Sequence, residues 1–165
     1  MLLKNNERNG IAVAGSIIVD KINEIKAYPQ VGELTQIVNL QQAIGGCVPN
    51  VGLDIKKICP ELHVTAIGKV GKDEEEAYVS GVLSQGGVDI SGIVAADAEK
   101  TSFTEVMSII NGQRTFFTYP GASAKFGYSD IDFENLDAKI LLLGYFLLLE
   151  KVDQGDGLLI LKKCT

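Results

Sequence analysis

A glycine pair placed just before a predicted helix constrains this chain more than any other stretch. Gly45 and Gly46 precede residues 50–58, in which apolar side chains recur at the spacing of one helical face. Glycine permits backbone conformations and a close ligand approach that other residues resist, and a helix start presents N–H groups at the positive end of a dipole. Asn50 adds, one turn in, a side chain that both donates and accepts hydrogen bonds. The stretch suits a neutral polyol such as a sugar, and a plain loop-to-helix turn is the alternative.

Buried strands are predicted on both sides of this stretch. Residues 10–20, 62–68 and 138–145 are short apolar runs, as expected of strands that are covered on both faces in an α/β protein. The first run ends at Asp20, which is therefore expected just past the carboxyl end of its strand. Ligands bind at that edge of an open parallel sheet, and a turn or a helix cap is the alternative role for Asp20.

Two further segments break the alternation of strands and helices. Residues 21–42 carry β-branched side chains on both sides of a turn, and residues 101–119 form a predicted hairpin around Asn111 and Gly112. Because a helix usually joins parallel strands, segment 21–42 is expected to be an inserted flap rather than part of the core.

Two more helices are predicted later in the chain. One covers residues 74–85, with Asp73 as its cap, and the other covers residues 153–164. No strand follows the second helix, although a parallel sheet alternates strands with helices. The sheet is therefore expected to be unfinished and the chain to be a fragment.

Charge and composition exclude several classes of protein. The 165 residues carry a net charge of −6 and show no basic patch, so the electrostatic footprint of a nucleic-acid binder is missing. No apolar run reaches the roughly 18 residues of a membrane span, and the start lacks a signal core. Three cysteines without paired spacing indicate reduced thiols. The protein is expected to be cytoplasmic, with no nucleic-acid or membrane partner.

The sequence contains no motif for a familiar catalytic centre. A Walker phosphate loop, the dinucleotide fingerprint, a nucleophile elbow and a Cys/His metal cluster are all missing. His63 is the only histidine and precedes a predicted strand, so a role at the strand edge is favoured over catalysis. No catalytic residue and no metal ligand is assigned.

The order of the short motifs is more specific than any one of them. Over about residues 11–145 it resembles the ribokinase-like (PfkB-type) carbohydrate kinases. The motifs that carry the resemblance are Gly15-Ser16-Ile17-Ile18-Val19-Asp20, Gly45-Gly46-x-x-x-Asn50, Gly68-Lys69-Val70-Gly71-Lys72-Asp73, Gly87-Val88-Asp89, Gly112-Gln113-Arg114-Thr115-Phe116 and Gly121-Ala122.

The resemblance implies an α/β fold, a three-layer αβα sandwich with a mostly parallel sheet and a small β-sheet lid. Residues 1–165 would form the amino-terminal part of a single kinase domain. Its core would comprise residues 10–20, 43–100 and 125–165, and its lid residues 21–42 with strands from 101–119.

The resemblance also implies a function, the phosphorylation of a sugar or related polyol with Mg-ATP. Asp20 would hydrogen-bond substrate hydroxyls, Gly45 and Gly46 would let the backbone approach the sugar, and Asn50 would bind a hydroxyl. Phe103 would face the substrate from the lid. Lids of this family often pair across a dimer, so a homodimer is expected.

The chain departs from the family pattern in two places. Cys47-Val48-Pro49 replaces the lysine and small residues common between the glycine pair and the asparagine, so no sugar preference carries over. The Asp-Thr-x-Gly-Ala-Gly-Asp segment, which supplies the catalytic base and an anion hole, and the Asn-x-x-Glu segment tied to magnesium are both missing. We expect the substrate-binding half of a kinase, inactive alone. The alternatives are a non-catalytic sugar-binding or oligomerisation module and, less favoured, an unrelated structural protein.

Overall fold

Two four-stranded sheets organise the computed structural model, which describes residues 8–110 and 112–164. The first, sheet A, is parallel throughout and has the order β5-β4-β1-β8. The second, sheet B, has the order β3-β2-β6-β7 and mixes parallel and antiparallel pairs. The strands are β1 (Ile11–Gly15), β2 (Ile18–Ile25), β3 (Ile37–Gly45), β4 (Val64–Val70), β5 (Asp89–Ala95), β6 (Ser102–Ile109), β7 (Arg114–Tyr119) and β8 (Ile140–Gly144).

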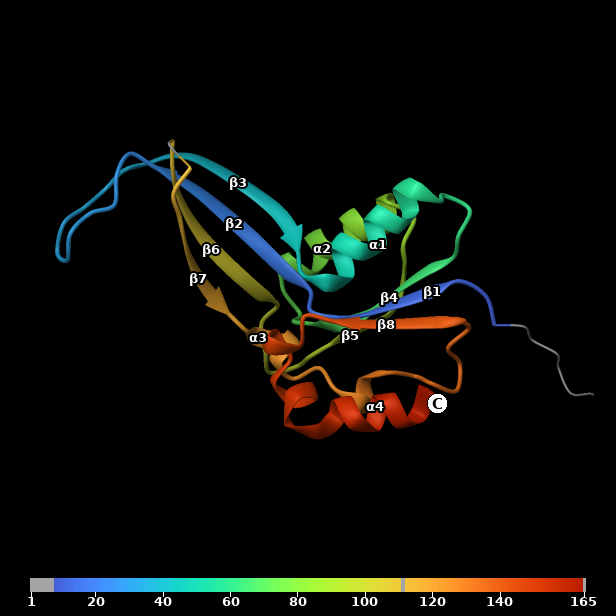
Figure 1. The fold of residues 1–165 in the computed structure, drawn as a ribbon. Coiled ribbons are helices and arrows are strands. Elements are labelled where there is room, and N and C mark those ends of the chain that lie inside the picture. The colour runs from blue at the N-terminus through green and yellow to red at the C-terminus, as the bar shows by residue number, and fades with distance from the viewer. Residues whose placement is uncertain (1–7, 111, 165) are drawn as a thin grey trace, which may run out of the picture.

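Helices cover both faces of sheet A, which gives three layers (Figure 1). On one face lie α1 (Cys47–Ile58) and α2 (Glu74–Gln85), and on the other lies α4 (Gly157–Cys164), which follows a helical segment kinked at Gly155. The short helix α3 (Gly121–Ala124) lies where the two sheets meet. The α/β class and the mostly parallel sheet flanked by helices are confirmed.

Each face of sheet A has its own hydrophobic core, and the alternation of side chains along β1 separates them. Val13 points towards α1 and α2, where it packs with Val48 and Leu83. Ala12 and Ala14 point to the other face, where the core includes Phe126 and Ile160. Small alanines on that side leave room for Phe126, which is fully buried.

The predicted strand over residues 10–20 is in fact two strands in different sheets. β1 ends at Gly15, and β2 begins at Ile18 after a short break. Asp20 therefore lies within β2 of sheet B, and its prediction at the carboxyl end of a core strand is wrong. The apolar run hides the break because β1 and the start of β2 are both buried on both faces.

Other boundaries differ from prediction in informative ways. The first helix begins at Cys47, before the predicted residue 50, and α4 begins only at Gly157. β8 was predicted as a buried strand, but it is an edge strand of sheet A among the described residues, and Ile140 is 54% exposed. In the predicted turn after β6, Asn111 lies outside the described residues. No helix in the described part of the chain is both long enough and apolar enough to span a bilayer.

Candidate functional site

Asp20 projects from β2 into a pocket on one face of sheet B. The pocket has a volume of about 310 Å³. Its lining comes from all strands of the sheet: Asp20, Ile22, Glu24, Asn39, Gln41, Val106, Ser108, Arg114 and Phe116. The Asp20 carboxylate makes no hydrogen bond or ion pair with any other described residue. Burial raises its pKa, because desolvation disfavours the charged form. A half-buried carboxylate without a partner is suited to accept hydrogen bonds from a ligand.

Gly45, at the end of β3, forms the wall behind the Asp20 carboxylate. A Cβ atom on Gly45 would lie 2.7 Å from Asp20 Oδ2. Gly46 adopts a positive φ of 91° and packs on the turn between β1 and β2, where a Cβ would lie 2.5 Å from the carbonyl oxygen of Ser16. The glycine pair is therefore required by close backbone packing, and it brings the end of β3 against the start of β2.

The backbone N–H groups at the start of α1 already have partners. Those of Cys47 and Val48 donate to the hydroxyl and the carbonyl oxygen of Ser16, each at 3.1 Å. Pro49 has no N–H, and the Asn50 N–H donates to the Gly46 carbonyl oxygen at 3.4 Å. The expectation that this helix start offers N–H groups to a ligand is wrong, because a serine from a distant turn caps it. The exposed Asn50 side chain makes no hydrogen bond to another described residue.

Phe103 lies on the opposite face of sheet B from Asp20. In the register of β2 and β6, Phe103 pairs with Val19 whereas Thr104 pairs with Asp20. Paired residues share a face of the sheet. The Phe103 ring faces the Lys21 ammonium, 4.7 Å from its centroid, and packs against the core below α1 and α2. The structure therefore does not bring Phe103 together with Asp20.

Several pocket residues were not predicted. Asn39, Gln41, Arg114 and Phe116 reach the pocket from β3 and β7. Within one strand, alternate side chains point to opposite faces of the sheet. The sequence does not reveal which set of side chains on one strand shares a face with which set on the neighbouring strand. Only the register decides that these side chains join Asp20.

The face of sheet B opposite the Asp20 pocket contacts α2 through an ion pair and a hydrogen bond. Lys21 Nζ lies 2.6 Å from Glu75 Oε1, and the Tyr78 hydroxyl donates to the Gln42 carbonyl oxygen at 3.2 Å. The hydrogen bond between the Lys21 and Glu75 side chains lowers the pKa of Glu75 and raises the pKa of Lys21. These contacts help to hold the strand that carries Asp20 at a defined position over the core.

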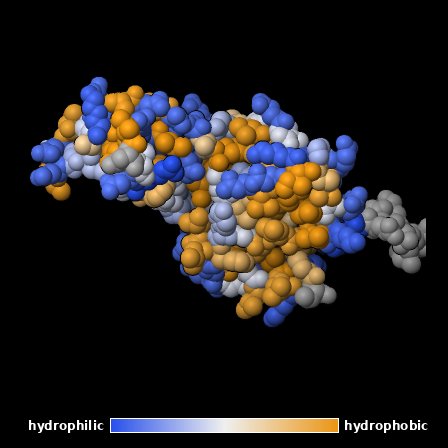
Figure 2. All heavy atoms as spheres, turned by 45° about the horizontal axis from the view of Figure 1, so that its top comes forward, coloured by the Kyte–Doolittle hydropathy of each residue, from blue (hydrophilic) through white to orange (hydrophobic). Residues whose placement is uncertain are grey.

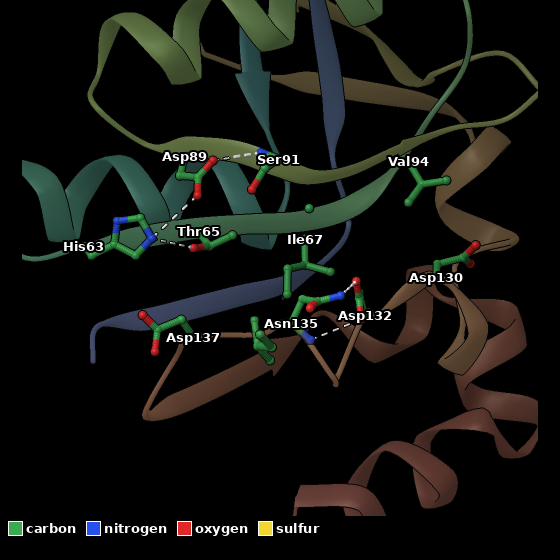
Figure 3. A pocket seen from close by; sticks show the side chains of 12 residues that line it. His63, Thr65, Ile67, Asp89, Ser91, Val94, Asp130, Asp132, Asn135 and Asp137 are labelled. Carbon is green, nitrogen blue, oxygen red and sulfur yellow. Dashed lines mark hydrogen bonds and ion pairs between the residues drawn. The ribbon is translucent and has the colours of Figure 1, made fainter. Parts of the chain in front are cut away.

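A second cavity, of about 380 Å³, lies between β4 and β5 of sheet A and the segment of residues 130–137 (Figure 3). His63 Nε2 lies 3.1 Å from the Thr65 hydroxyl and 3.5 Å from Asp89 Oδ2. Asp132 accepts hydrogen bonds from Asn135. Among residues 8–110 and 112–164, no cluster of acids, histidines and cysteines could hold a metal ion. The cavity shares no lining residue with the Asp20 pocket, so it forms a separate feature.

Comparison with known proteins gives a consistent result. The model of the pfkB family carbohydrate kinases matches residues 8–163. A probable fructokinase-4 of Arabidopsis thaliana is 27% identical over 124 residues, which are 75% of this chain and 36% of that protein. A ribokinase of Staphylococcus aureus is 25% identical over 123 residues, 74% of this chain and 40% of that protein.

A solved structure shares the fold. The Arabidopsis thaliana ribokinase complexed with ribose and ATP superposes with a TM-score of 0.70 at 23% identity, over 82% of this chain and 45% of that one. This chain thus spans less than half the length of each of these relatives. Because the family model covers nearly the whole sequence, the chain belongs to the pfkB family of carbohydrate kinases.

Proposed function

We propose that this chain forms the sugar-binding half of an ATP-dependent carbohydrate kinase, and that the Asp20 pocket receives the sugar. The unpaired Asp20 carboxylate against Gly45 carries this proposal. A carboxylate held between strands accepts hydrogen bonds from two neighbouring hydroxyl groups, which is the pattern that a sugar presents. Asn50 does not line this pocket, but it follows the same glycine pair by one helical turn, and its exposed amide would supply a donor and an acceptor for another hydroxyl of the sugar.

The start of α1 does not fit the phosphates of ATP, and the described residues hold no cluster that fits Mg²⁺. The N–H groups of Cys47 and Val48 are bound to Ser16 and cannot cradle a phosphate, and this part of the chain holds no cluster suited to a metal. We therefore derive no phosphoryl-transfer step. In the full kinase, Mg-ATP would be held by the Asp-Thr-x-Gly-Ala-Gly-Asp and Asn-x-x-Glu segments, which the 165 residues do not contain.

It follows that the 165-residue chain should bind sugar without phosphorylating it. General-base catalysis contributes about 10²–10⁴-fold, and phosphoryl transfer depends further on placing metal and phosphates. Titration calorimetry with a panel of sugars that includes D-ribose and D-fructose, each with and without Mg-ATP, tests the proposal, together with a coupled assay of ADP release. Sugar binding that ATP does not alter is the expected result. Robust phosphorylation by the pure chain would contradict the proposal that the chain is inactive alone. Absence of binding to every sugar tested would contradict the proposal that the Asp20 pocket receives a sugar.

A non-catalytic sugar-binding or oligomerisation module is the second candidate. It makes the same calorimetric prediction for the isolated chain but differs when the missing half is supplied. Adding a polypeptide with the Gly-Ala-Gly-Asp segment of a ribokinase in trans would restore phosphorylation for a divided kinase. It would leave a dedicated binding module inactive.

We further propose that the protein is a cytoplasmic homodimer that associates through sheet B. β3 and β7 are the outer strands of this sheet among the described residues, and they expose large apolar side chains, including Leu40 at 71% and Phe117 at 59%. Exposed strand edges with apolar side chains favour pairing with another chain. Figure 2 shows a second hydrophobic area, over the core, which offers another surface for association. A Phe117→Ser variant distinguishes the two surfaces, because Phe117 lies on β7 of sheet B. Sedimentation velocity should show a dimer that this change weakens; a monomer at high concentration would contradict it.

A further inference from the structure

Buried hydroxyl groups lie where the chain passes between the two sheets. Ser16 lies between β1 and β2, Ser102 begins β6, and Ser123 lies just after β7, in α3. Each of them is at most 1% exposed. Serine hydroxyls in such positions must find partners inside the protein, because an unpaired buried polar group is costly.

The Ser123 hydroxyl serves both backbone groups of Ile17. It accepts a hydrogen bond from the Ile17 N–H at 3.2 Å and donates one to the Ile17 carbonyl oxygen at 3.1 Å. Ile17 is fully buried and lies after β1 and before β2, outside the ladders of both sheets. One side chain therefore replaces the missing strand partner at the point where the chain leaves sheet A.

Further hydrogen bonds extend this contact in both directions. The Ser123 N–H donates to the Ser102 hydroxyl at 3.0 Å, and that hydroxyl donates to the Pro120 carbonyl oxygen. On the other side, Ser16 is adjacent to Ile17 and holds the first N–H groups of α1. Ser123 and Ser102 thus hold Ile17 at the start of β2, which carries Asp20, and the adjacent Ser16 holds the start of α1, which follows the end of β3 and Gly45.

We infer that Ser123 is a positioning residue for the sugar site, acting through Ile17 on the Asp20–Gly45 contact. The inference rests on the proposed function for its readout in sugar affinity, but the hydrogen bonds that carry it are independent of that function. Removing the hydroxyl leaves the Ile17 N–H and carbonyl without partners in the interior. The turn must then shift to find others, and the turn sets the position of Asp20.

The test compares Ser123→Ala with variants that separate position from stability. Ser123→Thr keeps the hydroxyl. Ile160→Ala opens a cavity in the core on the α4 side of sheet A, and it lowers stability without removing any hydrogen bond of Ser123, Ser102 or Ser16. D-ribose and D-fructose are titrated into each folded variant well below its melting temperature. We expect Ser123→Ala to weaken binding at least tenfold, Ser123→Thr to stay within threefold of the parent, and Ile160→Ala to bind as the parent does.

A second readout needs no sugar. Cys47 is buried, 2% exposed, and its N–H is held by Ser16, whereas Cys59 and Cys164 are exposed. In a background with Cys59→Ser and Cys164→Ser, an aromatic disulfide reagent reports how often the turn opens at Cys47. We expect labelling in Ser123→Ala to be at least tenfold faster than its measured loss of unfolding free energy accounts for, and labelling in Ile160→Ala to be no faster than its own loss accounts for. Should Ser123→Ala fail to fold, Ser102→Ala removes the next hydroxyl and should shift both readouts in the same direction.

The outcomes are distinguishable. If the parent binds no sugar, the proposed function fails, while Cys47 labelling still decides the role of Ser123. Parent-like affinity together with parent-like labelling in Ser123→Ala would overturn the inference. Equal losses in Ser123→Ala and Ile160→Ala would also overturn it, because the effect would then reflect stability alone.

Discussion

The carboxylate of Asp20 lies directly against the backbone of Gly45, where a Cβ atom would stand 2.7 Å from Oδ2. The two residues come from neighbouring antiparallel strands of sheet B. The contact keeps the carboxylate half-buried on the pocket side, where it has no hydrogen-bond or ion-pair partner among the described residues. Such a group costs stability in the free protein and becomes useful when a ligand supplies hydrogen-bond donors.

Asp20→Asn is expected to lower the affinity for sugar and to raise the free energy of unfolding at pH 7. Hydrogen bonds to a charged group contribute about 1.5–3 kcal/mol, so affinity for the sugar should fall about 10- to 100-fold. Burial raises the pKa of Asp20, so the folded protein binds this proton more tightly than the unfolded chain. The parent therefore loses stability as the pH rises from about 4 through the raised pKa, and the loss remains above it. The variant should be the more stable protein at pH 7.

Urea unfolding of both proteins at pH 4 and pH 7 checks this sign. The difference in unfolding free energy should favour the variant more strongly at pH 7. A variant that is less stable than the parent at pH 7 would show that Asp20 has a stabilising partner instead.

Asn50→Ala should separate binding from stability in the other direction. The Asn50 side chain is exposed and makes no hydrogen bond to another described residue, so the unfolding free energy should change by no more than about 0.5 kcal/mol. Loss of one or two neutral hydrogen bonds to the sugar should weaken binding about 5- to 10-fold in calorimetry. Asp54→Ala, on the same helix but paired with Lys57, is the control and should bind as the parent does. Unchanged affinity in Asn50→Ala would remove this residue from the site.

Gly46→Ala should be strongly destabilising. With φ 91° and ψ 174°, Gly46 lies in a backbone region that is essentially restricted to glycine, so a side chain is strained by about 1–3 kcal/mol, and the new Cβ would collide with the Ser16 carbonyl oxygen 2.5 Å away. We expect a total loss of about 3 kcal/mol or more, or failure to fold. Gly81→Ala in α2 is the matched control, because no atom lies within 4 Å of its Cβ position. That change should stabilise the protein by up to about 1 kcal/mol. Thermal unfolding of the two variants should shift in opposite directions.

Asp73→Ala should weaken the junction between α2 and sheet B. The Asp73 carboxylate caps α2 by accepting the Glu76 N–H at 3.0 Å, and it also accepts the N–H and hydroxyl of Thr101 at 2.8 and 2.6 Å. The lost cap and the unpaired Thr101 N–H together should cost about 2–4 kcal/mol at pH 7.

The same contribution should depend on pH. Burial raises the pKa of Asp73, but the hydrogen bonds from Thr101 and Glu76 outweigh it and leave the pKa below its ordinary value. The stabilisation is therefore present above about pH 4 and is lost as the pH falls through the lowered pKa. Urea unfolding at pH 7 and pH 2.5 should show the parent and the variant converging at the lower pH. A constant difference would mean that ionisation of Asp73 is not the source.

Sequence signals that act within a few residues were sufficient to predict several elements of the fold. The helix predicted over residues 74–85 is α2 with these bounds, and Asp73 caps it as expected. Both its acidic first turn and its glycines at the end are signals that operate within a few residues. The hairpin of β6 and β7 was also predictable, because an Asn-Gly turn between β-branched runs needs no distant partner.

The division of strands between the two sheets and the register of their pairing could not be predicted from local sequence signals. The break at Ser16 and Ile17 divides one apolar run between two sheets, and its backbone is satisfied by Ser123 from a distant segment. Phe103 was expected beside the sugar, but the register of β2 and β6 places it on the other face. A shift of one residue would reverse that result, and nothing local to either strand specifies it.

The sequence by itself determined the α/β class, the family and the small set of residues around the glycine pair, because these depend on local periodicity and on motifs in order. Only the tertiary structure decided what the glycine pair does. Its helix start is closed by Ser16, so its contribution is to bring Gly45 against Asp20. That outcome depends on contacts between segments that are far apart in the chain, and such contacts follow from packing and strand register rather than from local pattern.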